Sequence, residues 1–381
     1  MSTFMLPRII HHGKDSLQEL EEIEGQRAII VTDEGAMRKF GFIDKIVAHL
    51  ENAGLEVKVF EGVEPDPSVK TILEGKEIML DFKPDWIVAL GGGSPMDAAK
   101  GMWCFYEYPD LEFEDIIEVN SIPKLRNKAK FIAIPSTSGT ASEVTAFSVI
   151  TDTEKKIKYP LVSGELVADI AIVDPEIPST MPKHITANTG MDVLTHAIEA
   201  FVSTGATSYT DALALKAIEL VFEYLPKVYK NGDDLEAREM MHDASTIAGM
   251  AFSNASLGIV HSLAHKIGGE LHFTHGLANA ILLPYVIEFN YEAANNKFRI
   301  IEESLKVDNL ADAVRKLNSK VNIPITFKKI SNKFDVTEEM FEDALKRMPK
   351  NSHQDPCTLT NPNEPTIEDM KSLYKEAYYG K

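Results

Sequence analysis

Apolar positions in the first part of the chain follow two different periods. Short runs rich in β-branched residues, at 27–32 and 86–90, are typical of buried strands. Stretches at 41–52 and 69–82 instead place apolar residues three and four apart, which is typical of helices with one buried face. Strands that alternate with helices in this way predict a mostly parallel sheet with helices on its faces.

Further elements follow from the same rules. Strands are predicted at 55–60, 131–134, 146–151 and 170–173. Pro95 fits the first turn of a helix that continues through 96–103, because proline lacks the N–H group that has no partner there.

The pattern changes beyond Pro182. Long helical periods dominate, turn clusters thin out and β-branched runs largely disappear. A length of 381 residues also exceeds that of one typical core, so two domains are expected. The sequence therefore predicts an α/β domain over residues 1–183 and an all-helical domain over residues 184–381.

The composition narrows the possible partners. A net charge of −19 argues against nucleic acid and anionic membranes, which repel an acidic protein. The two cysteines, Cys104 and Cys357, are too few for a disulfide framework and indicate a reducing compartment. Residues 1–7 lack the features of a secretory signal, and no apolar run approaches the roughly 18 residues of a membrane helix. We therefore expect a cytoplasmic protein with no nucleic-acid or membrane partner.

Glycines at 91–93 lie between a predicted strand and a predicted helix. Glycines there let backbone N–H groups approach a pyrophosphate at the helix N-terminus. The loop is not the G-x-G-x-x-G fingerprint, because Met96 stands where its last glycine belongs. A tight turn without a ligand is the alternative.

Two other features favour a dinucleotide. Asp33 ends the strand at 27–32, where an acid can bind an adenosine ribose and repel a 2′-phosphate. It precedes the glycines instead of following them, so the topology differs from the usual Rossmann order. Small hydroxyl residues at 136–140 also follow a strand and can donate to a cofactor. Taken alone, each feature also fits an ordinary turn or loop.

Histidines and one aspartate gather in the helical part. Asp192 and His196, like His261 and His265, are four residues apart, which places each pair on one helical face. His272 and His275 follow closely. Residues 185–210 contain only two charged residues and residues 244–269 only one, whereas a chain with 25% charged residues places about six in such a window. These helices are therefore expected to be buried.

A buried aspartate and buried histidines need partners, because an unpaired buried charge is costly. One divalent ion that bridges two helices would satisfy them together; a hydrogen-bonded Asp–His network is the alternative. The spacing His261-Ser-Leu-Ala-His265 lacks the glutamate of the H-E-x-x-H metalloprotease signature. Imidazole and carboxylate ligands suit Fe(II), Zn and other first-row ions, so they leave the metal open.

These motifs together resemble the iron-dependent (group III) alcohol dehydrogenase family, and especially the alcohol-dehydrogenase half of bifunctional aldehyde–alcohol dehydrogenases. The resemblance spans essentially the whole chain. It is carried by residues 91–97, 135–145, 190–199, 261–268 and 275–276, with further support at 158–161 and in the C-terminal stretch. Two positions depart from the family pattern: Thr274 stands where many members have Pro, and Asp66 where some have Asn.

The resemblance implies specific roles for residues of this sequence. It implies metal ligation by Asp192, His196, His261 and His275, and it leaves His265 near the substrate, where a proton relay is expected. It implies dinucleotide binding by Asp33, Gly92, Gly93, Ser94, Asp97, Thr137, Thr140 and Lys158. Because NADP-preferring relatives often have a small residue in the place of Asp33, NAD(H) is the expected cofactor.

The expected function is hydride transfer between NAD(H) and a short-chain primary alcohol or aldehyde, with Fe(II), Zn or another divalent ion as Lewis acid. The resemblance also implies a homo-oligomer, a dimer or larger. One alternative is a Zn-dependent polyol dehydrogenase of the glycerol or propanediol type on the same fold. The other is a non-enzymatic nucleotide- or metal-binding regulatory protein.

Overall fold

The chain divides into two compact units, Met1–Thr180 and Met181–Lys381. The computed structural model describes residues 3–155 and 157–380, so the first two residues of the N-terminal stretch considered above lie outside it. The boundary expected from the sequence lies between residues 183 and 184, close to the observed division. Each unit is described by itself.

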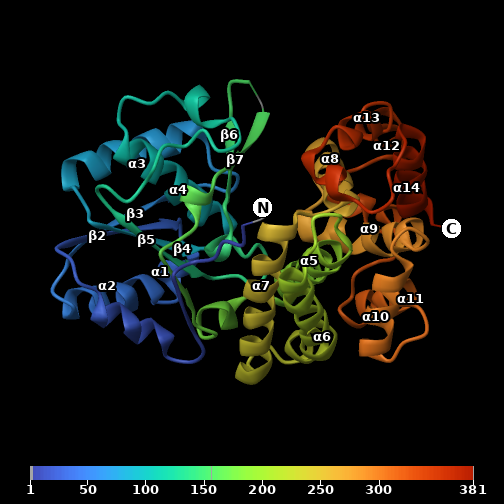
Figure 1. Cartoon of the computed structure of the whole chain (residues 1–381), viewed down its shortest axis with the longest axis horizontal. Helices are drawn as coiled ribbons and strands as arrows, with labels where there is room; N and C mark the ends of the chain where they lie inside the picture. The colour runs from blue at the N-terminus through green and yellow to red at the C-terminus, as the bar shows by residue number, and fades with distance from the viewer. Residues whose placement is uncertain (1–2, 156, 381) are drawn as a thin grey trace. The chain divides into compact units, whose positions relative to one another are not determined.

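The first unit contains a parallel six-stranded sheet in the order β1-β8-β5-β4-β2-β3 and an antiparallel ribbon of β6 and β7 (Figure 1). Its strands are β1 (Ile9–His12), β2 (Arg27–Asp33), β3 (Glu56–Val63), β4 (Trp86–Gly91), β5 (Lys130–Pro135), β6 (Phe147–Asp152), β7 (Ile157–Val162) and β8 (Ile170–Val173). Its α-helices are α1 (Ala36–Lys39), α2 (Phe42–Asn52), α3 (Val69–Phe82) and α4 (Gly93–Glu107), and short 3-10 helices include η1 (Ser16–Glu22) and η3 (Ser142–Val144).

The mostly parallel sheet predicted from the sequence is confirmed, but two strands were missed. β1 has only four residues, two of them histidines, and it forms a strand because it pairs with β8. β7 contains Pro160, which is unfavourable in a central strand and is tolerated here in a two-stranded ribbon. The strand predicted at 146–151 therefore pairs with β7 outside the main sheet.

Alternate residues of the central strands enter two separate cores, as the period of two in a strand requires. Ile29, Val31 and Ala89 belong to the core covered by α3 and α4. Ile30 and Val88 belong to the opposite core, covered by η1, α1 and α2. Because both faces of the sheet are buried, the sequences of β2 and β4 are continuous apolar runs.

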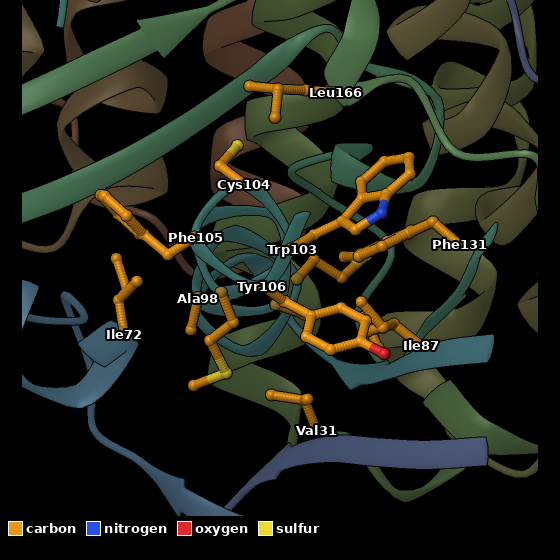
Figure 2. Close-up of a cluster of buried hydrophobic side chains, with 14 of the residues drawn as sticks. Val31, Ile72, Ile87, Ala98, Trp103, Cys104, Phe105, Tyr106, Phe131 and Leu166 are labelled. Carbon is orange, nitrogen blue, oxygen red and sulfur yellow. The ribbon is translucent and has the colours of Figure 1, made fainter. Parts of the chain in front are cut away.

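Trp103 occupies the centre of the first core (Figure 2). Its ring stacks on Phe131 of β5 with centroids 5.2 Å apart, and its indole N–H donates to the backbone oxygen of Ala129. Stacking and the hydrogen bond together anchor α4 over β5, because a buried indole is stable only when its N–H is satisfied. The position of α4 matters because its N-terminus carries the glycine loop.

The second unit is all-helical over its described residues, as predicted. Its α-helices are α5 (Lys183–Val202), α6 (Ser208–Lys230), α7 (Leu235–Ala255), α8 (Ile259–Leu271), α9 (His275–Asn290), α10 (Asn295–Leu305), α11 (Leu310–Lys320), α12 (Glu338–Ala344), α13 (Met348–His353) and α14 (Ile367–Tyr379). Residues 190–202 of α5 are all buried, which explains the shortage of charged residues there.

The length and composition of the helices can be compared with those of membrane-spanning segments. Among the described residues, no single helix has both the length and the apolar composition needed to cross a membrane. Taken as a pair, α7 and α8, which meet at a bend of 103°, pass that test by length and composition only.

Gly91 at the end of β4 combines a positive φ with a close neighbouring side chain. Its φ is +148°, and a Cβ there would lie 2.6 Å from Cγ of Pro95. We expect Gly91→Ala to lower the free energy of unfolding by about 1–3 kcal/mol, because it adds backbone strain and a clash. Urea unfolding of the purified variant measures this.

Gly92→Ala is the matched control, because a Cβ at Gly92 would lie 3.5 Å from Thr137, an ordinary contact, and its φ is −77°. Its free energy of unfolding should stay within about 0.5 kcal/mol of the unmodified protein. Equal losses in the two variants would show that the conformation of Gly91 is not the constraint.

Candidate functional site

The loops that follow β2, β4 and β5 meet at one edge of the parallel sheet. Thr32 of β2 lies beside Leu90 of β4, and Gly91 beside Pro135 of β5, so the three strands end together. β3 and β4 lie on opposite sides of β2, which makes the junction of β2 and β4 a topological switch point. Ligands of open α/β sheets bind outside the carboxyl ends of strands at such a point.

The glycine loop and the hydroxyl loop lie against each other at this edge. A Cβ on Gly92 would lie 3.5 Å from the side chain of Thr137, and one on Gly93 would lie 3.1 Å from Thr140. The backbone N–H of Ser136 donates to the carbonyl of Gly91 over 2.8 Å. α4 begins at Gly93, so its first-turn N–H groups are available to an anion between the two loops.

Asp33 lies next to this edge at the end of β2, after an irregularity in the pairing with β3. Its side chain is half-buried, and its Oδ1 is buried with no hydrogen-bond partner in the part of the chain that the structure describes. Burial raises the pKa of Asp33, while a hydrogen bond from the backbone of Ala36 opposes the rise. A buried oxygen without a partner fits a ligand hydroxyl as donor.

Asp97 and Lys158 have protein partners instead of facing an open site. Asp97 accepts hydrogen bonds from the Ser142 hydroxyl (2.9 Å) and from the backbone N–H of Val149 (3.0 Å). Burial raises the pKa of Asp97 to about 6 against the opposing charge of Lys100. Lys158 on β7 forms an exposed ion pair of 2.7 Å with Asp66, whose backbone N–H donates to the hydroxyl of Ser94.

Lys100 was missed by the sequence analysis. Its buried ammonium donates to the backbone oxygens of Ser142 (2.7 Å), Thr145 (2.9 Å) and Phe147 (2.8 Å). Burial lowers the pKa of Lys100 to about 8, while Asp97 and Glu143 oppose the shift. The lysine therefore fixes the segment 142–147, which continues the hydroxyl loop. The available signal was a single basic residue in the middle of a mostly apolar helix.

Three predicted metal ligands come together in the second unit. Asp192 of α5, His261 of α8 and His275 at the start of α9 present ligand atoms that all lie within 4.8 Å of one another. Asp192 Oδ1 is 3.8 Å from His261 Nε2 and 3.5 Å from His275 Nε2. Asp192 and His261 are buried and His275 is partly exposed, so the cluster lies at the margin of the helical core.

Asn279, four residues after His275, lies against the same three groups. Its Nδ2 is 2.6 Å from Asp192 Oδ1, 3.3 Å from His261 Nε2 and 3.1 Å from His275 Nε2. An amide nitrogen has two hydrogens and cannot satisfy three acceptors. The surplus of acceptors fits a cation, and the donor set of two imidazoles and one carboxylate suits a first-row divalent ion.

His196, the fourth predicted ligand, lies beside this cluster. Its ring stacks on His261 with centroids 4.6 Å apart and on Phe252 with centroids 4.3 Å apart. Its nitrogens are not among the atoms that fall within 4.8 Å of one another. His272, which follows closely after His265 in the sequence, is exposed and adopts a left-handed conformation at the end of α8.

Glu199 is a buried carboxylate behind His261. Its Oε2 lies 2.5 Å from His261 Nδ1, and its Oε1 accepts the backbone N–H of Val260 over 2.6 Å. A Cβ on Gly258 would lie 2.8 Å from that Oε1, so the carboxylate needs the glycine. Burial raises the pKa of Glu199 to about 8, with backbone hydrogen bonds from Val260 and Gly258 opposing.

The electrostatics of this pair favour a cation. Burial, with added repulsion from His196 and His275, lowers the pKa of His261 well below its usual value. A neutral His261 that donates Nδ1–H to Glu199 presents the lone pair of Nε2 to the cluster. A divalent ion there would balance the two buried carboxylates, Asp192 and Glu199.

A second group of possible ligands consists of His265, Asp355 and Cys357. Lys266 donates to Asp355 Oδ2 over 2.8 Å, which places a positive charge where an ion would bind. Burial would raise the pKa of Asp355, but His265 and Lys266 outweigh it and hold that pKa well below its usual value. This group therefore fits an ion pair better than a metal site.

Helical spacing could have identified two of the residues missed. Glu199 follows Asp192 by seven positions and His196 by three, so the three share one face of α5. Asn279 follows His275 by four positions on α9. Asp355 is 90 residues from His265 in the sequence, and no local pattern connects the two.

Both halves of the chain match models of one family. Residues 7–175 match "iron-containing alcohol dehydrogenase", and residues 186–378 match "Fe-containing alcohol dehydrogenase family, C-terminal". The chain is 50% identical over its whole length to 99% of the NADPH-dependent butanol dehydrogenase of Clostridium saccharobutylicum. It is also 44% identical to 46% of an aldehyde–alcohol dehydrogenase of Streptococcus pneumoniae, so it spans less than half of that bifunctional relative.

Solved structures agree with the family models. An iron-containing alcohol dehydrogenase of Thermococcus thioreducens superposes with a TM-score of 0.92 at 37% identity, with all of both chains covered. A 1,3-propanediol oxidoreductase superposes with a TM-score of 0.91 at 34% identity, covering 99% of this chain and 100% of its own. The α/β unit followed by a helical unit is therefore the fold of this family.

We expect Glu199→Gln to weaken binding of Zn²⁺ or Fe²⁺ by about 10- to 100-fold, because partners of ligating histidines contribute that much to metal affinity. Equilibrium competition with a chelator of known affinity measures the change. Glu223→Gln on α6 is the control, since Glu223 is exposed and forms an ion pair with Lys227 at the surface. Equal affinity in the Glu199 variant and the control would contradict a role for Glu199 in metal binding.

Proposed function

Because the chain belongs to the iron-containing alcohol dehydrogenase family, whose models match residues 7–175 and 186–378, we propose that it interconverts short-chain primary alcohols and aldehydes with NAD(H) as hydride carrier. The observation that carries this proposal is the convergence of Asp192, His261 and His275 on a common centre. Alcohol–aldehyde interconversion is the activity of the family. The chain length of the substrate and the choice of NAD are the proposed specifics.

The proposed metal ligands are Asp192, His196, His261 and His275. A divalent ion bound there supplies Lewis-acid chemistry toward an alcohol or carbonyl oxygen. Asp192 and Glu199 supply the negative charge that retains the ion, and His261 is oriented by its hydrogen bond to Glu199. His196, whose ring stacks on that of His261, is the fourth proposed ligand. Iron is the proposed metal, with Zn as the alternative.

His265 is the proposed proton relay. Its side chain is 40% exposed, while its ring lies 5.5 Å from the ring of His275 and 6.0 Å from that of His261, measured between centroids. A residue that touches both the ligand histidines and solvent can accept the alcohol proton and release it outside. The family pattern and this exposure support the assignment.

The dinucleotide is proposed to bind at the carboxyl edge of the parallel sheet. Gly92, Gly93 and Ser94 supply backbone and hydroxyl donors beside the N-terminus of α4, and Thr137 and Thr140 line the facing loop. Asp97 contributes by holding segment 142–149, and Lys158 by its pair with Asp66. Asp33 is proposed to bind the adenosine ribose and so to favour NAD over NADP.

A polyol dehydrogenase is the second candidate function, favoured by the likeness to a 1,3-propanediol oxidoreductase. The test of both is steady-state kinetics of the Fe(II)-loaded, Zn-loaded and metal-free protein with NADH and a series of aldehydes, and with NAD and alcohols that include 1,3-propanediol and glycerol. Saturable turnover of butanal with the Fe(II) form supports the proposal. Turnover confined to polyols with Zn would support the second candidate, and no turnover by any form would refute both.

We also propose that the protein is a cytoplasmic homo-oligomer, a dimer or larger, with no nucleic-acid or membrane partner. The small number of cysteines and the family pattern support this. Light scattering after size-exclusion chromatography measures the mass of the particle against 42.3 kDa for one chain.

We expect His261→Ala to lose bound metal and to lower kcat/KM on the order of 1,000-fold, because it removes a ligand and with it several kcal/mol of transition-state stabilisation. Metal content by mass spectrometry and NADH oxidation measure the two effects together. His184→Ala on the exposed start of α5 is the control and should retain both. An active variant without metal would contradict the metal-dependent reaction.

We expect Asp33→Gly to improve kcat/KM for NADPH relative to NADH by roughly tenfold, because it removes a charge that repels the 2′-phosphate. The butanol dehydrogenase that is 50% identical to this chain is described as NADPH-dependent, which makes the measurement decisive for this chain. Glu34→Gln, at the exposed neighbouring position, is the control. An unchanged ratio in the Asp33 variant would contradict the role of its carboxylate.

A further inference from the structure

The side chain of Asp355 forms a hydrogen bond with one ring nitrogen of His265, Nδ1. Asp355 Oδ2 lies 3.1 Å from His265 Nδ1, and the ammonium of Lys266 donates to the same oxygen over 2.8 Å. The carboxylate is 5% exposed, whereas His265 is 40% exposed. An ionised carboxylate only accepts hydrogen bonds, so His265 must donate through Nδ1–H.

The other nitrogen of His265, Nε2, makes no hydrogen bond to any described residue. The ring stacks nearly parallel to that of His275, with an interplanar angle of 14°, and lies edge-on to that of His261. In a neutral imidazole with the proton on Nδ1, Nε2 carries a lone pair. His265 therefore offers a proton acceptor beside the candidate metal cluster.

Asp355 is fixed in place by the segment that follows it. Its Oδ1 accepts the backbone N–H of Cys357 over 3.1 Å and so caps the 3-10 helix η8 (Pro356–Thr360). Thr358 donates to Ser262 of α8 over 2.8 Å, and Thr360 donates to the carbonyl of Leu257 over 2.7 Å. The segment is thus fastened to the helix that carries His265, which holds the carboxylate in register with the imidazole.

We propose that Asp355 is a positioning residue that holds His265 as the Nδ1–H tautomer and keeps Nε2 free to accept the proton of the alcohol. The inference rests on the proposed function of the site. In alcohol oxidation the hydride leaves carbon for NAD⁺ and the hydroxyl proton goes to Nε2, from which the exposed ring returns it to water.

The substitution Asp355→Asn tests the tautomer of His265 without disturbing the fold around it. The amide oxygen of asparagine can still accept from the N–H of Cys357, which preserves the cap of η8. With the amide oxygen on the N–H of Cys357, the amide nitrogen faces His265 Nδ1 as a donor, and the partly exposed ammonium of Lys266 turns to water. The ring then accepts at Nδ1 and carries its proton on Nε2. We expect a switch to the Nε2–H tautomer and a fall in kcat of about 10- to 100-fold, with KM for the aldehyde within about threefold.

The tautomer is measured by ¹⁵N NMR of the full-length Zn-loaded protein labelled at histidine, with the signal of His265 assigned from His265→Gln. Zn is diamagnetic, and the reading does not depend on turnover. Lys266→Gln is the control: it removes the second donor to Asp355 Oδ2 but should leave the Nδ1–H tautomer and kcat unchanged within about threefold.

Two results would overturn the inference. One is an Nε2–H signal from His265 in the unmodified protein, which needs no variant to fold. The other is an Asp355→Asn variant with the unmodified tautomer or an unmodified kcat. A protein with the Nδ1–H tautomer but no alcohol or aldehyde turnover would instead refute the proposed function and leave the assignment of the tautomer intact.

Discussion

The arrangement of the helical unit depends on two buried carboxylates, Asp192 and Glu199, which need partners. Both are nearly inaccessible, and the hydrogen bonds they accept come from Asn279, His261 and the backbone at the start of α8. Neutral donors satisfy their hydrogen-bonding capacity, but ionisation stays costly in a medium of low polarity, as the raised pKa of Glu199 shows. The surrounding helices bring ligand atoms of Asp192, His261 and His275 within 4.8 Å of one another, an arrangement that suits a cation.

In the first unit, the main constraint is the alignment of three loops that come from separate strands. Parallel register brings the ends of β2, β4 and β5 level, and the bond between Ser136 and Gly91 joins two of the loops directly. The buried ammonium of Lys100 then binds three backbone oxygens of the segment that follows. This buried lysine acts as a rigid connector, since its removal would take one charged donor from three backbone carbonyls at once.

Much of this architecture follows from local pattern. The period of two in the central strands, the glycines before α4 and the four-residue spacing of Asp192–His196 and His261–His265 are each readable within a few residues. β1 and β7 were missed because their residues are polar or include proline, and only pairing with a distant strand makes them strands. Glu199 and Asp355 were missed as partners of histidines because hydrogen bonds between remote segments, 62 and 90 residues apart, define their roles.

The fastening of segment 355–361 to α8 has a consequence for how the site comes into being. Asn361 accepts the backbone N–H of Ile259 and exchanges two hydrogen bonds with Asn290, so it joins the first turn of α8 to the end of α9. During synthesis, α5, α8 and α9 leave the ribosome well before this segment does. A nascent chain thus possesses every proposed ligand before it possesses Asn361, the residue that joins α8 to α9.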